Sequence, residues 1–568
     1  MKFTSGLAAF ALAATTLAAQ PASAATPVPP TQLAADWSSG QLADGLVMGQ
    51  YGADVGLTVD AGLAFDALGR TADANRVADA IADRLVTSDE VPYGYVSSDE
   101  YDWQPPYDFV QVGYYANATA KAAAFAHRLG RDAATAYPDV DLIAQLETLT
   151  GPDGVIADDS SFDNYANTIG QAFAVEALTA AASGEASAAT DALLAQQCPA
   201  GYFRFDLDAA ACSADTAGVA PDTTALVVLS LLESGDTSTE VTSAITEATA
   251  WLQSVQLANG SFEGDASAPG SNSNSTGLAG WALGDAGLTA SAAKAAAWVR
   301  SMQVADAGAC VSQAPTGAIA YNADDLAAAR AAGIAGNATI QDKWRRAAFQ
   351  AAPVLRWAPA ATTPLSISTP ATAVEKSSVT ATVRGLAAGE QGCVSLGGDA
   401  RRVVGTGADL AVAFTLPAGA AAHTFTLATL GGSTTATTTA SLTPVVAVPP
   451  VTPVPTVAAK VKIAKVEKVR KNRFKVALVC AEAAPCAGKI KVRTATKVAV
   501  DGLKKKKVVR VSEKRYSLVA GSKKQVSLRL TKTARALVAD GRLKVKSIAT
   551  ARGGDRVVTT FSLKSARG

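Results

Sequence analysis

One short turn pattern recurs six times in the first three hundred or so residues of this chain. In its clearest copies a glutamine is followed by a glycine four positions later and an apolar residue two positions after that, as in Gln256, Gly260 and Phe262. The six glycines are Gly45, Gly94, Gly154, Gly201, Gly260 and Gly308, so successive copies lie 49, 60, 47, 59 and 48 residues apart. Self-similarity at a period near fifty predicts stacked supersecondary units that share one core.

Two kinds of helical segment alternate with these turns. Segments such as 57–65 and 222–229 are apolar on nearly every side, which predicts helices buried on nearly every side. Segment 75–86 instead places Val77 and Ile81 four residues apart among charges, which predicts an amphipathic outer helix. We therefore expect residues 31–359 to form an all-α ring of six helical hairpins, an (α/α)6 toroid, with no strand inside the helical span.

The polar residues before the buried segments are typical of helix N-caps. Asp222-Thr-Thr and Asn274-Ser-Thr are two such lead-ins, and each offers a side-chain oxygen to a free backbone N–H group. Each turn glycine follows an outer helix, where glycine tolerates the left-handed conformation that ends it.

The composition changes after Pro359. Residues 362–446 are rich in Thr, Val and Ala and alternate as strands do, which predicts an immunoglobulin-like β-sandwich. Residues 447–459 contain four prolines and predict a semi-rigid linker. Residues 460–568 alternate Lys or Arg with Val, Leu and Ile, which predicts a second all-β sandwich with a basic face. The chain is thus expected to be multidomain.

The first 24 residues are typical of a secretory signal peptide. Lys2 precedes an apolar run over 7–19, and Ala22-Ser-Ala24 is a small-residue cleavage site. The run is too short to span a bilayer, and we expect no transmembrane segment elsewhere. The protein is therefore expected to be secreted, either extracellular or associated non-covalently with the cell wall.

Six cysteines in an exported chain favour disulfides. Proximity in sequence predicts Cys198–Cys212 and Cys480–Cys486. The pairing of Cys310 and Cys393 stays open.

Net charge is zero overall but strongly divided along the chain. From Lys460 onward there are 31 basic and 6 acidic residues, and the remainder holds 50 − 31 = 19 basic and 50 − 6 = 44 acidic residues. This split predicts that the basic end binds an anionic polymer of the cell envelope, with no nucleic-acid partner expected. The candidate contacts, which lie near turn signals, are Lys504, Lys505, Lys506, Lys507, Lys523 and Lys524. The alternative is a solvated strand face, because lysines also keep edge strands from aggregating.

The repeat resembles the QW-type motif of the terpenoid cyclase and protein prenyltransferase superfamily. Phe203, Phe262 and Val47 stand where that motif usually has tryptophan. The resemblance covers roughly residues 31–357 and implies an α/α toroid. It implies no single activity, since similar toroids serve cyclases, prenyltransferases, thioester domains, cobalamin carriers and polysaccharide lyases.

The catalytic motifs of these relatives are not found. The chain has no D-x-D-D acid of the squalene-type cyclases, and only His127 lies in the toroid span as a ligand for a prenyltransferase zinc. We expect no metal and no cofactor, and the sequence favours a protein that is not an enzyme.

The ligand mouth is expected where the inner helices begin, because helix N-termini offer free N–H groups and a positive dipole end. The candidate contacts are Asp60, Tyr165, Asn167, Asp222, Thr223, Asn274 and Trp281. The first hypothesis is an envelope-associated protein that binds an unknown small molecule or glycan in its toroid. The alternatives are an enzyme on the same face, either a polysaccharide lyase or glycan-acting enzyme or a divergent terpene cyclase, and a cobalamin-carrier-like protein.

Overall fold

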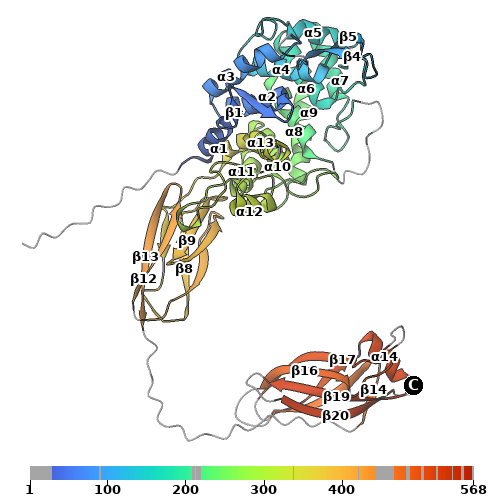
Figure 1. Ribbon diagram of the computed structural model, residues 1–568, viewed down its shortest axis with the longest axis vertical. Helices are drawn as coiled ribbons and strands as arrows, with labels where there is room; N and C mark the ends of the chain where they lie inside the picture. The colour runs from blue at the N-terminus through green and yellow to red at the C-terminus, as the bar shows by residue number, and fades with distance from the viewer. Residues whose placement is uncertain are drawn as a thin grey trace, which may run out of the picture. The chain divides into compact units, whose positions relative to one another are not determined.

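The computed structural model divides the chain into two compact units, Met1–Pro444 and Val445–Gly568 (Figure 1). It describes residues 28–88, 91, 93–207, 212, 219–334, 336, 338–419, 421–441, 466–480, 486–500, 505–519, 522–539, 541–551 and 556–565. The signal-peptide prediction over 1–24 and the linker prediction over 447–459 lie outside these residues. No helix in the described part is long and apolar enough to cross a membrane.

Six buried helices form a closed ring in the first unit. They are α2 (Val55–Ala67), α4 (Ala116–Arg128), α6 (Thr168–Ala180), α8 (Pro221–Glu233), α10 (Ser273–Asp285) and α13 (Ala338–Ala351). Each packs on the next in this order, and α13 packs on α2, which closes the circle. The described residues of α2, α4, α6, α8 and α10 are mostly buried and apolar or small, as expected for helices covered by both neighbours and by an outer helix, whereas α13 keeps a charged, exposed face.

Six further helices surround the ring. They are α1 (Pro30–Ser39), α3 (Thr71–Ile81), α5 (Leu142–Thr148), α7 (Ala186–Leu194), α9 (Thr239–Val255) and α11 (Thr289–Met302). Each packs mainly on one inner helix, some also touch the next, and α1 pairs with α13 at the point where the ring closes. The segments η1 (Ala82–Arg84), η2 (Gly308–Cys310), α12 (Ala323–Ala332) and η3 (Ala352–Trp357) complete this part.

In its clearest copies the recurrent turn binds its hairpin to the next outer helix. The Gln256 side-chain amide donates to the carbonyl of Gly260 at 3.1 Å and to that of Ser291 in α11 at 2.9 Å. Gly260 has a φ of +91°, and a Cβ atom on it would lie 2.3 Å from the Lys294 carbonyl oxygen. Glycine is therefore required both by the backbone conformation and by the close approach of α11.

The sixth turn lies at Gly317, not at Gly308 as the spacing predicted. Gln303 donates to the carbonyl of Gly317 and to that of Pro30 in α1, so this copy closes the ring. An inserted segment containing η2 separates Gln303 from its glycine, which is why the spacing placed the turn too early. The second copy also differs, because Gly94 is not among the residues with a positive φ.

Short strands interrupt the helical span, so the expectation of a strand-free ring was wrong. One small sheet comprises β1 (Leu42–Ala43), β2 (Leu46–Gly49) and β3 (Gly52–Ala53). A longer antiparallel hairpin comprises β4 (Ser97–Tyr101) and β5 (Phe109–Tyr114). Both lie in connections from an outer helix to an inner helix. Strands can pair there without interrupting the helices of the ring.

Two sheets with a common core follow the ring in the same unit. Their strands are β6 (Ser366–Ser368), β7 (Thr372–Val374), β8 (Ser378–Arg384), β9 (Gln391–Leu396), β10 (Asp399–Val404), β11 (Leu410–Thr415), β12 (Ala422–Thr429) and β13 (Gly432–Ser441). The strand orders are β10-β9-β12-β13-β7 and β11-β8-β6. Phe414 from one sheet meets Phe425 from the other edge to face at 5.5 Å. The immunoglobulin type of this module stays a prediction.

The second unit was predicted to be all-β, but it also contains a helix. Its strands are β14 (Val466–Val469), β15 (Arg473–Val479), β16 (Cys486–Thr494), β17 (Arg510–Leu518), β18 (Lys523–Arg529), β19 (Arg542–Ala551) and β20 (Arg556–Ser565). They form the sheets β14-β20-β19-β16-β17 and β15-β18. A helix, α14 (Lys532–Ala539), contributes Ala534 and Val538 to the core. Its Ala- and Leu-containing sequence favours a helix, and the Thr531 hydroxyl caps it by accepting from the Ala534 N–H group.

Two disulfides are described completely. Cys198–Cys212 is confirmed as predicted, and Cys310–Cys393 answers the pairing that the sequence left open. The second joins η2 of the helical part to β9. Cys480 is disulfide-bonded, but its predicted pairing with Cys486 is untested because the Cys486 side chain lies outside the described residues.

Charged and polar contacts surround the Cys310–Cys393 bond. Asp306, which is 8 % exposed, forms ion pairs with Arg330 of α12 and Arg402 of β10. Gln391 of β9 donates to the carbonyls of Ser301 and Gln303. The β module is thus fixed to the segment that closes the ring.

We predict that Gly260→Ala destabilises the ring far more than Gly235→Ala. Both glycines have positive φ, but a Cβ on Gly235 would meet nothing within 4 Å. The control should lower the free energy of unfolding by about 1–2 kcal/mol from backbone strain alone, whereas Gly260→Ala adds overpacking and should lower it by about 2–5 kcal/mol. Equal losses in urea unfolding would contradict the close approach.

Candidate functional site

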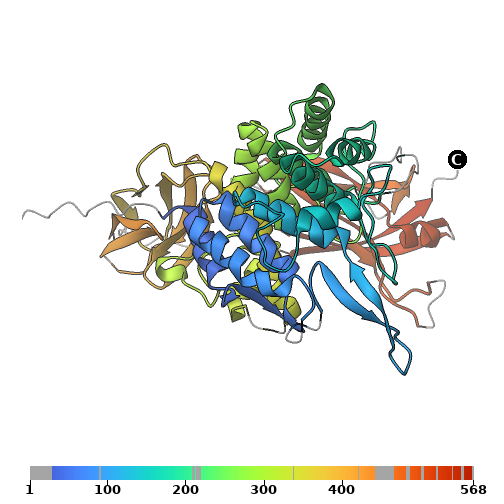
Figure 2. The same ribbon diagram turned by 90° about the horizontal axis from the view of Figure 1, so that it is seen from above.

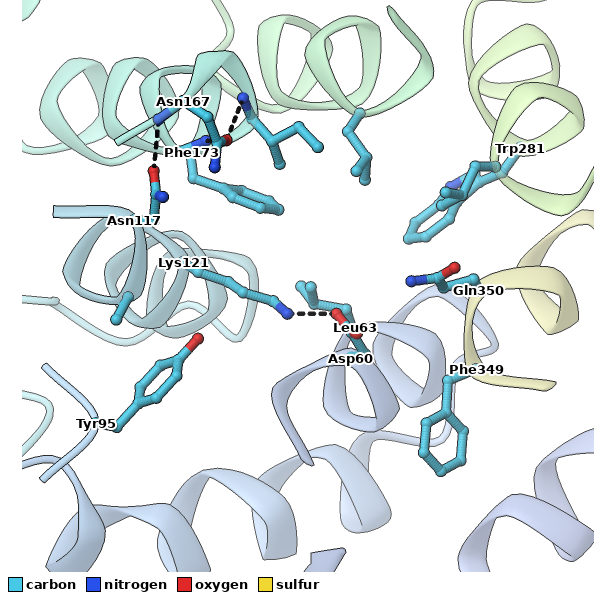
Figure 3. Close-up of a pocket in the computed structure, with 15 residues that line it drawn as sticks. Asp60, Leu63, Tyr95, Asn117, Lys121, Asn167, Phe173, Trp281, Phe349 and Gln350 are labelled. Carbon is cyan, nitrogen blue, oxygen red and sulfur yellow. Dashed lines mark hydrogen bonds and ion pairs between the residues drawn. The ribbon is translucent and has the colours of Figure 1, made fainter. Parts of the chain in front are cut away.

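A cavity of about 410 Å³ lies at the centre of the ring. All six inner helices line it, together with Tyr95 from the connection before β4 (Figure 3). The lining residues are Asp60, Leu63, Tyr95, Asn117, Ala118, Lys121, Asn167, Ile169, Gly170, Phe173, Leu226, Leu278, Trp281, Phe349 and Gln350. A volume in this range and a mostly apolar wall are typical of small-molecule sites.

One wall of the cavity carries an ion pair. The Lys121 ammonium on α4 lies 2.5 Å from Asp60 Oδ1 on α2 and donates to the Gly56 carbonyl at 2.9 Å. Both side chains are less than one-fifth exposed. Burial lowers the pKa of Lys121, but the Asp60 charge outweighs that effect and holds the pKa above its ordinary value. The pair therefore presents both a cation and an anion while adding no net charge.

Two further polar groups face the cavity from different sides. Burial raises the pKa of the Tyr95 hydroxyl, which stays protonated and points toward the cavity (Figure 3). Across the cavity, the Gln350 oxygen accepts from the Asn274 amide at 2.5 Å, and the Gln350 amide nitrogen faces inward (Figure 3). These groups offer hydrogen bonds to a ligand held against the apolar wall.

The two asparagines at the rim are occupied by structural contacts. Asn167 caps α6 by accepting from the N–H groups of Ile169 and Gly170. Asn117 donates to the Tyr165 carbonyl at 2.6 Å and accepts from the Asn167 N–H group. They shape the rim and fix the loop in front of it.

Aromatic side chains form much of the apolar wall. Phe173, Trp281 and Phe349 come from three different helices, and each is less than one-tenth exposed. The Trp281 indole N–H donates to Asp285 at 2.5 Å, which fixes the orientation of the ring. The wall therefore offers large, oriented apolar surfaces at little cost in side-chain entropy.

A second set of charges lies at the C-terminal ends of the inner helices. Arg128 binds Glu176 through two hydrogen bonds of 2.7 Å, with both side chains at most 5 % exposed. Arg356 of η3 donates from one guanidinium nitrogen to both carboxylate oxygens of Asp285, at 3.0 and 2.9 Å. Because these residues satisfy one another, they hold neighbouring helices together and leave the cavity as the candidate site.

The sequence-based candidates divide into two groups. Asp60, Asn167 and Trp281 line the cavity, whereas the Tyr165 side chain is 68 % exposed outside it. Asp222, Thr223 and Asn274 lie in the first turns of α8 and α10 and do not line the cavity. Whether any of these residues binds a ligand stays a prediction.

Two predicted N-caps were wrong by two residues each. Asp222 lies inside α8, which begins with Pro221 and has no side-chain cap. Asn272, not Asn274, caps α10 by accepting from the Ser275 N–H group. The Oδ1 atoms of Asp222 and Asn274 are buried and accept no hydrogen bond from the described residues, and burial raises the pKa of Asp222. The sequence placed both helix starts too late because several polar residues precede each apolar run.

Lys121, Tyr95 and Gln350 line the cavity but were not among the residues predicted from the sequence. A signal for Lys121 existed, since it is the only lysine or arginine between Arg84 and Arg128 and interrupts an alanine-rich inner helix. No sequence signal pointed to Gln350, because it follows an amphipathic segment whose pattern predicts an outer helix. Among the described residues, no three His, Cys, Asp or Glu side chains gather as a metal site requires.

The lysine candidates of the second unit are exposed where they are described. Lys505, Lys506 and Lys507 lie before β17, and Lys523 and Lys524 lie on β18. Lys504 lies outside the described residues.

No family model matches this chain, and no curated protein matches it. Solved structures with a similar fold include the type II terpene cyclase MstE from Scytonema, at 15 % identity and a TM-score of 0.38, over 58 % of this chain and 97 % of that one. A protein from Actinoplanes (16 %, TM-score 0.37) and a glycosidase variant (14 %, TM-score 0.36) each match over 58 % of this chain and 98 % of theirs. At these scores none of the likenesses carries an argument about this chain, and its ring rests on the helix contacts described above.

We predict that Asp60 and Lys121 are energetically coupled. Asp60→Asn or Lys121→Met leaves one buried charge unpaired and should cost about 2–4 kcal/mol of unfolding free energy, somewhat below a fully buried pair. The double variant should cost less than the sum by about 1–3 kcal/mol. As a control, Asp409→Asn breaks the exposed pair with Arg384 and should cost less than about 1 kcal/mol. Additive losses in a urea double-mutant cycle would show that the pair is not coupled.

Proposed function

We propose that this protein is a secreted, envelope-associated binding protein whose ring holds a small, uncharged ligand with an apolar body and a hydroxyl or carbonyl group. The observation that carries the proposal is the central cavity, to which all six inner helices contribute. The apolar wall takes the body of the ligand, and the Asp60–Lys121 pair with Tyr95 takes its polar group. We further propose that residues 1–24 direct export and that the β modules position the ring, the first as an immunoglobulin-like domain over 362–446 and the second as a basic module over 460–568.

The charge state of the cavity favours binding over acid catalysis. Asp60 is the only carboxyl among the lining residues, and it faces the Lys121 ammonium at 2.5 Å. Because Asp60 Oδ1 is already engaged by the Lys121 ammonium, the lining residues offer no free carboxyl group to donate a proton to an alkene or a glycosidic oxygen. The volume of about 410 Å³ also favours a ligand smaller than a corrinoid.

The role of the cavity in binding is tested with a variant that fills it with a larger side chain. Nile red, a neutral apolar dye with a carbonyl group, should bind the full chain and gain fluorescence. Leu226→Trp places a large ring in the cavity and should weaken this binding at least about tenfold. Leu257→Trp is the matched control, because Leu257 is 38 % exposed outside the cavity. Unchanged dye affinity in Leu226→Trp, at wild-type unfolding stability, would reject the cavity as the binding site.

We propose that the second unit binds an anionic envelope polymer. Lys505, Lys506 and Lys507 form a consecutive exposed run in the most basic part of the chain. Contacts of this kind weaken as salt rises, because exposed charges are screened within about 8–10 Å near physiological ionic strength.

We predict that the run of three lysines contributes more to cell-wall binding than the same number of dispersed lysines. The full chain should be retained on purified cell walls at low salt, and changing Lys505, Lys506 and Lys507 to Gln should move its elution to lower salt. Changing the dispersed, exposed Lys475, Lys532 and Lys564 to Gln removes the same charge and should have a smaller effect. If neither salt nor either triple variant changes retention, the second unit does not bind through its charge and acts only as a spacer.

A further inference from the structure

The β4–β5 hairpin projects from the helical body and carries an unusual density of exposed aromatic side chains (Figure 2). Trp103 is 84 % exposed, Tyr107 59 %, Phe109 54 % and Tyr101 45 %. Tyr101 and Phe109 pair across the strands, with their rings edge to face at 5.9 Å. Contiguous exposed apolar surface on a folded chain marks a binding surface more often than chance, so this tip calls for a partner.

The base of the hairpin is held firmly. Glu100 is 2 % exposed, and its carboxylate accepts from the Ser160 hydroxyl and from the Ser161 N–H and hydroxyl groups, each at 2.6 Å. Burial raises the pKa of Glu100, but these hydrogen bonds outweigh that effect and lower it, so the contacts persist at neutral pH. Tyr114 and Asp159 exchange two backbone hydrogen bonds beside them. The aromatic tip is therefore presented on a fixed support.

Further exposed aromatics lead from this support to the cavity rim. Phe162 and Tyr165, 51 % and 68 % exposed, lie in the loop that holds Glu100. The Tyr165 carbonyl accepts from Asn117, which lines the cavity. Phe205, also exposed, accepts through its carbonyl from the N–H group of Thr168, the first residue of α6. These hydrogen bonds fix the backbone of segments that carry exposed rings between the hairpin support and the cavity rim.

The charge of these segments excludes anionic partners. Residues 93–120 contain four carboxylates, of which Glu100 is buried, and no lysine or arginine, and residues 158–165 add three more carboxylates and again no base. Anionic membranes and anionic polysaccharides are repelled by such a surface. An uncharged sugar chain is not, because each pyranose ring lays an apolar C–H face on an aromatic ring while its hydroxyl groups donate to carboxylates.

We propose that the β4–β5 hairpin is a stacking platform for an uncharged polysaccharide, with Trp103 and Tyr107 as its principal contacts. Aromatic residues carry much of the binding energy where they stand exposed before binding and covered after it. This inference does not depend on what the cavity holds.

Depletion from solution by microcrystalline cellulose, chitin and curdlan tests the proposal on the full chain. The wild type should bind at least one of the three polymers. The double variant Trp103→Ala with Tyr107→Ala should bind it at least about tenfold more weakly, as loss of two aromatic contacts implies. Replacing both with Phe should restore most of the affinity. Tyr51→Ala removes a 97 % exposed aromatic outside the hairpin and should change nothing.

Binding by the hairpin can be distinguished from binding by the basic second unit and from binding in the cavity. Sodium chloride at about 0.5 M screens the basic unit and should leave this binding unchanged, while Nile red affinity reads the cavity alone. Failure to bind any of the three polymers, or equal binding by the alanine variant, overturns the proposal. Trp103-dependent co-sedimentation with vesicles of phosphatidylcholine and phosphatidylglycerol, without polysaccharide binding, overturns it in favour of a membrane surface.

Discussion

Three junctions of the ring, including the one that closes it, share one interaction, in which a glutamine amide bridges its own turn and the next outer helix. Gln197, Gln256 and Gln303 each make this bridge, to α9, α11 and α1 respectively. A glycine in each turn lets the following helix approach its backbone directly, so consecutive hairpins meet at a fixed separation. Because the last bridge returns to the first helix, the same local geometry that joins neighbours also closes the circle.

The repeat allowed the ring to be predicted because its signals are local. Asn167 was correctly identified at the start of α6, where its side chain caps the helix. Predictions failed where tertiary context decides. An insertion between Gln303 and Gly317 displaced the sixth turn, and Pro221 starts α8 before the polar residues that looked like a cap. The sequence also does not tell which face of an alanine-rich helix points inward, so the position of Lys121 in the cavity appeared only in the structure.

The cavity combines a local ion pair with electrical neutrality. Asp60 and Lys121 cancel one another's charge, yet each keeps hydrogen-bonding capacity on the side that faces the cavity. An ionic ligand would compete with a pair already formed, whereas a hydroxyl or carbonyl group adds a hydrogen bond without breaking it. The acidic, aromatic surface outside the ring likewise disfavours anionic partners.

The Cys310–Cys393 disulfide has a mechanical consequence. Residues 311–392 lie between its two ends, and they include α13, the inner helix that closes the ring against α2. Tension entering from the C-terminal side therefore passes across the sulfur–sulfur bond from β9 to η2 and bypasses that whole loop. The seam between the last and first hairpins, which non-covalent contacts hold, is shielded from force that would otherwise peel α13 out of the circle.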